Sequence, residues 1–229
     1  MAIKSDKTET KPKEIIVKAL MNLANTHDWN TITLPMIAEK AEMSLLEIHE
    51  YFPSKGAMLG GFAKMIDRKV LSGTTADMQD EPMRERLLDI MMRRLDALDP
   101  YKMAIKNIKN HVKYDPLSIF ALNAVAVNSW RYMLAAAGID TEGHMGGLRV
   151  QGIAIIFAGS LDTWLNDDTE GHQKTMAMFD KKLKQGEDTL HKVESAVKFV
   201  SPLLDKLGKM FEKRGAQRKS SESDMATEI

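Results

Sequence analysis

The chain has 229 residues, no cysteine and 44% hydrophobic residues, and its 32 lysines and arginines balance its 32 aspartates and glutamates. This composition provides enough apolar surface for a buried core, and it excludes a disordered chain, disulfide bonds and cysteine metal sites. Because the formal net charge is zero, no global field draws the chain to nucleic acid or to an anionic membrane, so any such attraction must be local.

The first twelve residues are polar and have no apolar core, so they do not have the pattern of a secretory signal. The longest apolar run, from about Ile153 to Leu165, is interrupted by Gly159, Ser160 and Asp162 and is too short to span a bilayer. We therefore expect a cytoplasmic protein.

Nearly every segment has helical rather than alternating periodicity, which predicts an all-α fold. After a flexible N-terminus over residues 1–12, the pattern predicts a compact head over 13–72, with helices at 13–26, 34–40, 44–52 and 54–71. The tight turn at Glu42 and Met43 gives the second and third helices the layout of a helix-turn-helix.

The pattern predicts a second, helical domain over residues 81–187. Its helices are expected at 81–98, 101–113, 117–137, 148–165 and up to about 185, with a flexible glycine-rich connection over 143–147. Helices 117–137 and 148–165 are apolar nearly all the way round, and a helix without a polar face must be covered on every side. We expect these two helices at the centre of the domain, at a homodimer interface, or both.

Residues 188–214 predict a long amphipathic helix, and residues 215–229 a disordered tail. The apolar stripe is flanked by lysines, which suits a helix that lies on the surface of an anionic membrane. An intramolecular cover or an antiparallel seam remains an alternative, and Pro202 should kink the helix. The residues predicted to contact a membrane are Val197, Lys198, Val200, Leu204, Leu207, Lys209 and Phe211.

The side chains of the third helix argue against strong DNA binding. A phosphate-binding face should be basic, yet this helix has Leu46 and Glu50 on it, and the head holds as many acidic as basic residues. Glutamates can still accept hydrogen bonds from cytosine amino groups. If the head does bind DNA, the candidate contacts are Ser44, Leu45, Glu47, His49, Tyr51 and Lys55.

The two apolar helices offer two interpretations. Their side chains could fill a helical core or a four-helix dimer seam, or they could line a tunnel for a lipid chain, for which an alanine- and methionine-rich lining leaves room. The candidate lipid-binding residues are Leu122, Val125, Met133, Ile153, Ile156, Phe157 and Leu161.

The sequence does not favour an enzyme. Its six histidines stand alone without metal-ligand spacing, and no glycine-rich loop has the pattern of a phosphate cradle. The pair Asp167 and Asp168 lies at a predicted helix end, where capping explains it. We expect no catalytic residue, no metal and no cofactor.

The segment from Lys13 to about Leu71 resembles the helix-turn-helix head of tetracycline-repressor-like (TetR-like) regulators. The resemblance rests on Ile37 and Ala38 before the turn and on the string from Tyr51 to Lys55 after the third helix. It implies a TetR-like fold. The family has a phosphate-contacting tyrosine at the position of His49 and small or basic residues at positions 45–47, so this chain departs from the pattern.

Segments 94–101, 129–132 and 148–168 have an order and spacing that resemble the coenzyme Q biosynthesis protein nine family, and the resemblance extends up to about Gln185. It implies that residues 81–187 form a lipid- or ligand-binding and dimerisation domain. This resemblance implies a non-catalytic, dimeric protein, peripheral on the inner face of the membrane, that binds an isoprenoid lipid or quinone and presents it to the ubiquinone-pathway hydroxylase. Trp164 and Leu165 would form the docking patch for that enzyme. The alternative is a ligand-responsive, DNA-binding transcriptional regulator.

Overall fold

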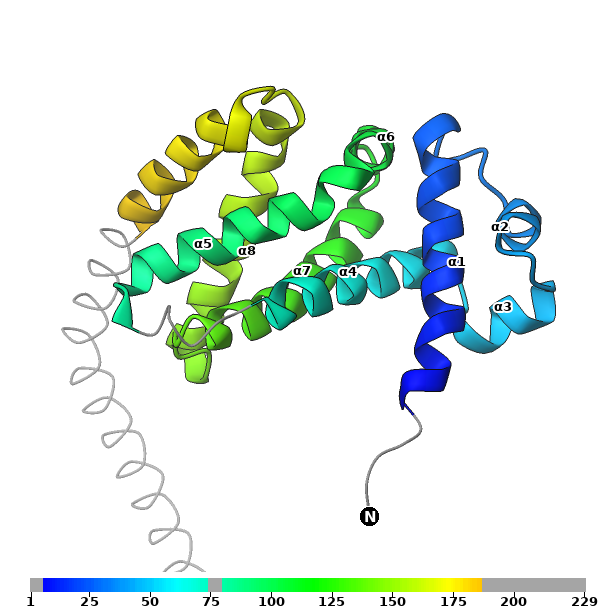
Figure 1. The fold of residues 1–229 in the computed structure, drawn as a ribbon, viewed down its shortest axis with the longest axis horizontal. Helices are drawn as coiled ribbons and strands as arrows, with labels where there is room; N and C mark the ends of the chain where they lie inside the picture. The colour runs from blue at the N-terminus through cyan, green and yellow to red at the C-terminus, as the bar shows by residue number, and fades with distance from the viewer. Residues whose placement is uncertain (1–5, 74–79, 187–229) are drawn as a thin grey trace, which may run out of the picture. The chain divides into compact units, whose positions relative to one another are not determined.

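The computed structural model describes residues 6–73 and 80–186, with side chains from Pro12 onward. All regular structure in these two ranges is helical, so the expectation of an all-α fold is confirmed (Figure 1). Within the same ranges, no helix is both long and apolar enough to cross a membrane. The described residues up to Leu183 form one compact unit.

From here on we call α1 (Asp6–Thr26), α2 (Leu34–Ala41) and α3 (Leu45–Tyr51) the head, and we count the fourth helix of the predicted head with the body (Figure 1). The apolar stripe of α1 is buried, and Ile16, Leu20 and Ala24 are fully covered in a core that also contains Ile37 and Ile48. α1 begins earlier than the predicted start at residue 13, because Pro12 within the helix removes one backbone hydrogen bond without ending it.

Short-range capping sets the bounds of the two helices after α1. The Thr33 side chain accepts a hydrogen bond from the backbone nitrogen of Met36 and so begins α2, which ends at Glu42 in the left-handed region with a φ of 55°. Ser44 begins α3 in the same way. Since both caps can be read from the sequence, the predicted bounds of these helices agree with the structure to within a residue or two.

The body follows with α4 (Lys55–Ser72), α5 (Met83–Leu98), the short 3-10 helix η2 (Asp99–Tyr101), α6 (Lys102–Val112), α7 (Pro116–Ala136), α8 (Gly143–Leu165), η3 (Glu170–His172) and a last helix over residues 173–186. α4 packs against α1 on one side and against α5 and α7 on the other, so it connects the head to the body (Figure 1).

A buried polar junction fixes α4 relative to α5 and α7. Arg94 Nη1 on α5 and Ser129 Oγ on α7 each donate to Asp67 Oδ1 on α4, at 2.5 Å. The Arg94 guanidinium also lies 5.4 Å from the ring centroid of Trp130 and 5.7 Å from that of Phe157. Because breaking such a pair leaves a buried charge without its partner, the junction favours one arrangement of the three helices.

Residues 143–147 form the first turn of α8, so the prediction of a flexible connection there was wrong. The glycines have a packing role: a Cβ on Gly146 would lie 2.1 Å from the carbonyl carbon of Thr141. Gly143 adopts a φ of +65°, which side-chain-bearing residues rarely do. The helix can therefore start tightly against the preceding loop only because these positions lack side chains.

Candidate functional site

The most distinct local structure in the head is the N-terminus of α3. Ser44 Oγ accepts from the backbone nitrogen of Glu47 at 3.2 Å, and Glu47 Oε2 accepts from both the nitrogen and the hydroxyl of Ser44 at 2.7 Å. This reciprocal capping box lowers the pKa of Glu47, first through the backbone hydrogen bond from Ser44. Two of the predicted DNA contacts, Ser44 and Glu47, therefore hold the helix in place.

Ile48 anchors α3 in the core of the head, and its opposite face is open. Leu46 is 71% exposed and Leu45 is 49% exposed, while His49 and Glu50 are exposed beside them. We call these four residues the α3 face. Of the six predicted contacts, only Leu45 and His49 belong to it, whereas Leu46 and Glu50 were absent from that set.

Lys55 has a structural role that its sequence motif did not reveal. Its Nζ donates to the backbone oxygens of Trp29 at 2.7 Å and of Ile32 at 2.9 Å, and it lies 4.4 Å from the ring centroid of Trp29. Partial burial lowers the pKa of Lys55. Its ammonium thus ties the loop between α1 and α2 to the start of α4 and points into the head.

Tyr51, the last of the predicted DNA contacts, is half-buried at the end of α3, with Lys13 Nζ 5.9 Å from its ring centroid. Together with Phe52 it borders a cleft of about 650 Å³ between α1, the end of α3, α4 and α7. We call it the head–body cleft. Gly60 and Gly61 line it from α4, and adjacent glycines inside a helix, which cost helix stability, were the signal that could have drawn attention to it.

The seven candidate lipid-binding residues occupy different surroundings. Met133, Ile153 and Phe157 are buried in the body's core, and the rest are half-buried: Leu122, Val125, Ile156 and Leu161. Val125 is the member of this set that lines the head–body cleft. The set therefore lies on α7 and α8, partly in the core, and is not gathered around that cleft.

Helices α7 and α8 also leave large apolar side chains uncovered. Phe120 is 76% exposed and Leu117 is 81% exposed on α7, while Leu148 and Ile155 are more than half exposed on α8. The expectation that these two helices are covered on every side is not met by the described part of a single chain. We call these four residues the α7–α8 face.

Trp164 is 0% exposed and Leu165 is half-buried, so the interpretation of Trp164 as an exposed docking residue was wrong. The Trp164 ring packs against that of His172 at 6.4 Å, and Lys102 Nζ lies 5.5 Å from the indole centroid. The position near a helix end suggested exposure, but the segment that follows α8 turns back over the ring.

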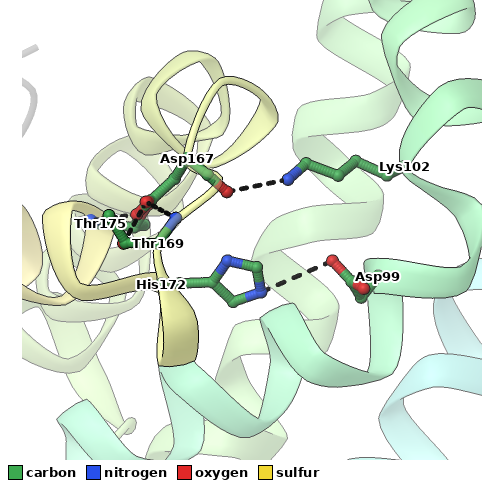
Figure 2. A network of polar contacts seen from close by, with 6 residues as sticks. All are labelled: Asp99, Lys102, Asp167, Thr169, His172 and Thr175. Atoms are coloured by element: carbon green, nitrogen blue, oxygen red, sulfur yellow. Dashed lines mark hydrogen bonds and ion pairs between the residues drawn. The ribbon is translucent and has the colours of Figure 1, made fainter.

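Asp167 organises that returning segment (Figure 2). Its buried carboxylate accepts from the nitrogen and hydroxyl of both Thr169 and Thr175, and its backbone oxygen accepts from Lys102 Nζ at 3.2 Å. Burial acts to raise the pKa of Asp167, but the four hydrogen bonds outweigh it and hold that pKa well below its ordinary value. His172 Nε2 lies 3.5 Å from Asp99 Oδ1 and ties the loop to η2.

Among the described residues, no three histidine or acidic side chains are grouped so that they could hold a metal ion. The predicted membrane contacts lie outside the described residues, as does the helix predicted over 188–214. Two features therefore remain as candidate binding surfaces in the head and beside it: the α3 face and the head–body cleft.

No protein-family model matches the chain, and no curated protein matches it either. Solved structures do. A TetR transcriptional regulator from Nitrosomonas europaea is similar with a TM-score of 0.58 and 21% identity, over 76% of this chain and 96% of that one. A TetR regulator from Rhodococcus has a TM-score of 0.56 and 16% identity, over 76% and 97% of the two chains.

A TetR-family regulator from Streptomyces coelicolor is similar with a TM-score of 0.52 and 14% identity, over 86% of this chain and 84% of that one. At these identities the similarity shows the fold, and the expectation of a TetR-like fold is confirmed. The resemblance to the coenzyme Q biosynthesis family has no support from these comparisons.

Proposed function

We propose that this protein is a ligand-responsive, sequence-specific DNA-binding regulator that acts as a homodimer. One observation carries the proposal: α3 is a capped helix, anchored by the buried Ile48, whose outer face is open, on a fold similar to that of TetR regulators. A short helix presented in this way fits the major groove of DNA. The α3 face is the part that would reach the bases.

The side chains of the α3 face favour recognition of DNA through direct contacts with bases rather than through attraction to phosphates. Leu45 and Leu46 offer apolar surface to thymine methyl groups, Glu50 can accept from a cytosine amino group, and His49 can bond a base edge or a phosphate. The Lys55 ammonium is held by backbone oxygens, and Glu47 adds a negative charge. We therefore expect modest affinity with a shallow dependence on salt.

A homodimer would explain the uncovered apolar side chains of the body. Leu117 and Phe120 on α7, with Leu148 and Ile155 on α8, are large, apolar and exposed in the single chain. Large exposed apolar side chains on two helices that pack together are typical of an interface, and a twofold dimer uses the same surface on both copies. In such a dimer, the two α3 helices would each contact one half-site of a DNA palindrome.

Selection of DNA from a random library by the purified full-length protein tests this function. The proposal expects enrichment of one palindromic sequence at physiological salt, with half-sites about 10 base pairs apart or a multiple of that spacing. Recovery of random DNA, with no sequence enriched after repeated rounds of selection, would argue against sequence-specific DNA binding. Leu46→Ala should reduce enrichment, and Met103→Ala, which removes an exposed apolar side chain from α6, should leave it unchanged.

A second candidate follows from the α7–α8 face. An exposed apolar surface on helices with the coenzyme Q-like sequence segments would suit a non-catalytic protein that binds an isoprenoid lipid or quinone at the inner face of a membrane and delivers it to a hydroxylase. Native mass spectrometry of the purified full-length protein distinguishes the two. A co-purified prenyl lipid would favour this second function, and a lipid-free dimer would count against it.

A further inference from the structure

The head–body cleft has a size and position that fit a small ligand. Its volume of about 650 Å³ lies within the range typical of ligand pockets. Its walls come from four helices, with Val17 on α1, Tyr51 at the end of α3, Gly60 on α4 and Val125 on α7. We propose that this cleft binds an amphipathic anion, a carboxylate or phosphate with a short apolar body.

The lining of the cleft provides space for the apolar part. A Cβ on Gly61 would lie 2.8 Å from the ring of Phe52, so this glycine lets that ring pack against α4. Gly60 is different: its Cβ would meet only Val125 Cγ2, at an ordinary 3.8 Å, and the cleft lies beyond. The space beside Gly60, between Val17, Phe52 and Val125, is apolar and suits a short hydrocarbon.

The charges of the cleft favour an anion. Its two carboxylates are already paired, Glu14 with Arg68 at 2.8 Å and Asp67 with Arg94 at 2.5 Å. Lys64 also lines the cleft, is exposed, and forms no ion pair with the rest of the described chain. A bound carboxylate or phosphate would meet the Lys64 ammonium, while Asn128 and Tyr132 add donors from α7.

The position of the cleft also suggests what binding does. Tyr51 and Phe52 end α3, whereas Val125, Asn128 and Tyr132 belong to α7, so a ligand between them contacts the head and the body together. A ligand that fits one arrangement of α3 and α7 better than another shifts the population toward it. This regulatory consequence rests on the proposed DNA-binding function, but the binding site itself does not.

Isothermal titration calorimetry of the full-length protein tests the site, with sodium octanoate and 1-octanol as probes. The two probes share a chain length and differ in charge. We expect saturable binding of octanoate, up to about fivefold tighter than that of octanol, since one partly exposed charge contact contributes up to about 1 kcal/mol. Absence of saturable octanoate binding would overturn the proposal.

Matched variants on α4 locate the bound probe. Gly60→Leu fills the cleft and should weaken octanoate binding about tenfold or more, while Gly56→Leu, an exposed glycine on the same helix, should bind as the native protein does. Equal affinities for these two variants would place octanoate elsewhere and overturn the proposal. Circular dichroism melts verify that both are folded.

Lys64→Gln provides a test that does not depend on packing. It should remove most of the preference for octanoate over octanol, whereas Lys69→Gln, exposed on α4 outside the cleft, should keep it. If Lys64→Gln keeps the full preference, the proposed cationic site is wrong. If the protein binds octanoate but selects no DNA sequence, the binding site is supported and the DNA-binding function is rejected. If it selects a DNA sequence but does not bind octanoate, the DNA-binding function is supported and the binding site is rejected.

Discussion

Lys55 Nζ lies 2.7 Å from the backbone oxygen of Trp29, and this hydrogen bond joins the start of α4 to the loop that leads into α2. The same ammonium donates to Ile32 and lies over the indole ring of Trp29. A lysine that begins the helix after a DNA-recognition helix suggests a contact with phosphate. Here the Lys55 ammonium instead donates hydrogen bonds to two backbone carbonyls. The position of α2 and α3 relative to α4 therefore depends on Lys55.

Lys55→Met should destabilise the fold by about 1 to 3 kcal/mol, because it leaves two partly buried carbonyls without their donor. Urea denaturation monitored by circular dichroism measures the change. Lys69→Met on the exposed side of α4 is the matched control and should alter stability by less than about 0.5 kcal/mol. Equal effects of the two substitutions would show that the Lys55 hydrogen bonds contribute no stability.

Asp167 gives the fold an acid-sensitive element. The folded pKa of Asp167 lies below its ordinary value of 3.8, so the carboxylate contributes its full stability above that value and loses the contribution as the pH falls from there through the folded pKa. Asp167→Asn should therefore be less stable than the native protein at about pH 6, by about 1 to 3 kcal/mol, and the gap should narrow toward about pH 3. Denaturant melts over this pH range check it, and a gap independent of pH would contradict the role of the charged form.

Gly146→Ala should destabilise the protein even though alanine favours helices. The new Cβ would lie 2.1 Å from the backbone of Thr141, so the start of α8 must shift, at a cost of about 1 to 3 kcal/mol. Gly152→Ala on the same helix meets nothing within 4 Å and should stabilise by about 0.5 to 1 kcal/mol. Thermal melts of the pair measure both effects, and stabilisation by both substitutions would mean that residues 143–147 do not pack as an α8 turn.

Phe120→Glu should convert the proposed dimer to monomer. A carboxylate placed on the apolar α7–α8 face must be desolvated twice in a twofold interface, which is costly. Light scattering coupled to size-exclusion chromatography measures the mass in solution. Met103→Glu, a change of similar exposure on α6, should remain dimeric. If Phe120→Glu has the native mass, the face is not the interface.

The sequence predicts the helices of this fold well because periodicity and caps are local. Thr33, Ser44 and Ser54 each cap the helix that follows, and the residue type and position of all three identify them as caps from the sequence alone. Long-range contacts cannot be predicted in this way. Trp164 is buried because Asp167 and His172 hold a loop over it, and no local sequence pattern indicates the path of that loop.

The candidate site shows the same division. The helix-turn-helix could be predicted from its spacing, since turn and caps lie within a few residues of each other. The role of Lys55 could not, because its acceptors at Trp29 and Ile32 lie in a distant loop. The head–body cleft combines α1, α3, α4 and α7, so its lining exists only after those helices pack together.

The most direct measurement is fluorescence anisotropy of the selected DNA palindrome with native protein, Leu46→Ala and Met103→Ala, from about 50 to about 200 mM salt. We predict that Leu46→Ala weakens binding by about 1 to 3 kcal/mol at every salt concentration, that Met103→Ala matches the native protein, and that the salt slope is shallow. Native affinity in Leu46→Ala, or a steep salt slope with no preference for the palindrome, would contradict the claim that α3 reads DNA.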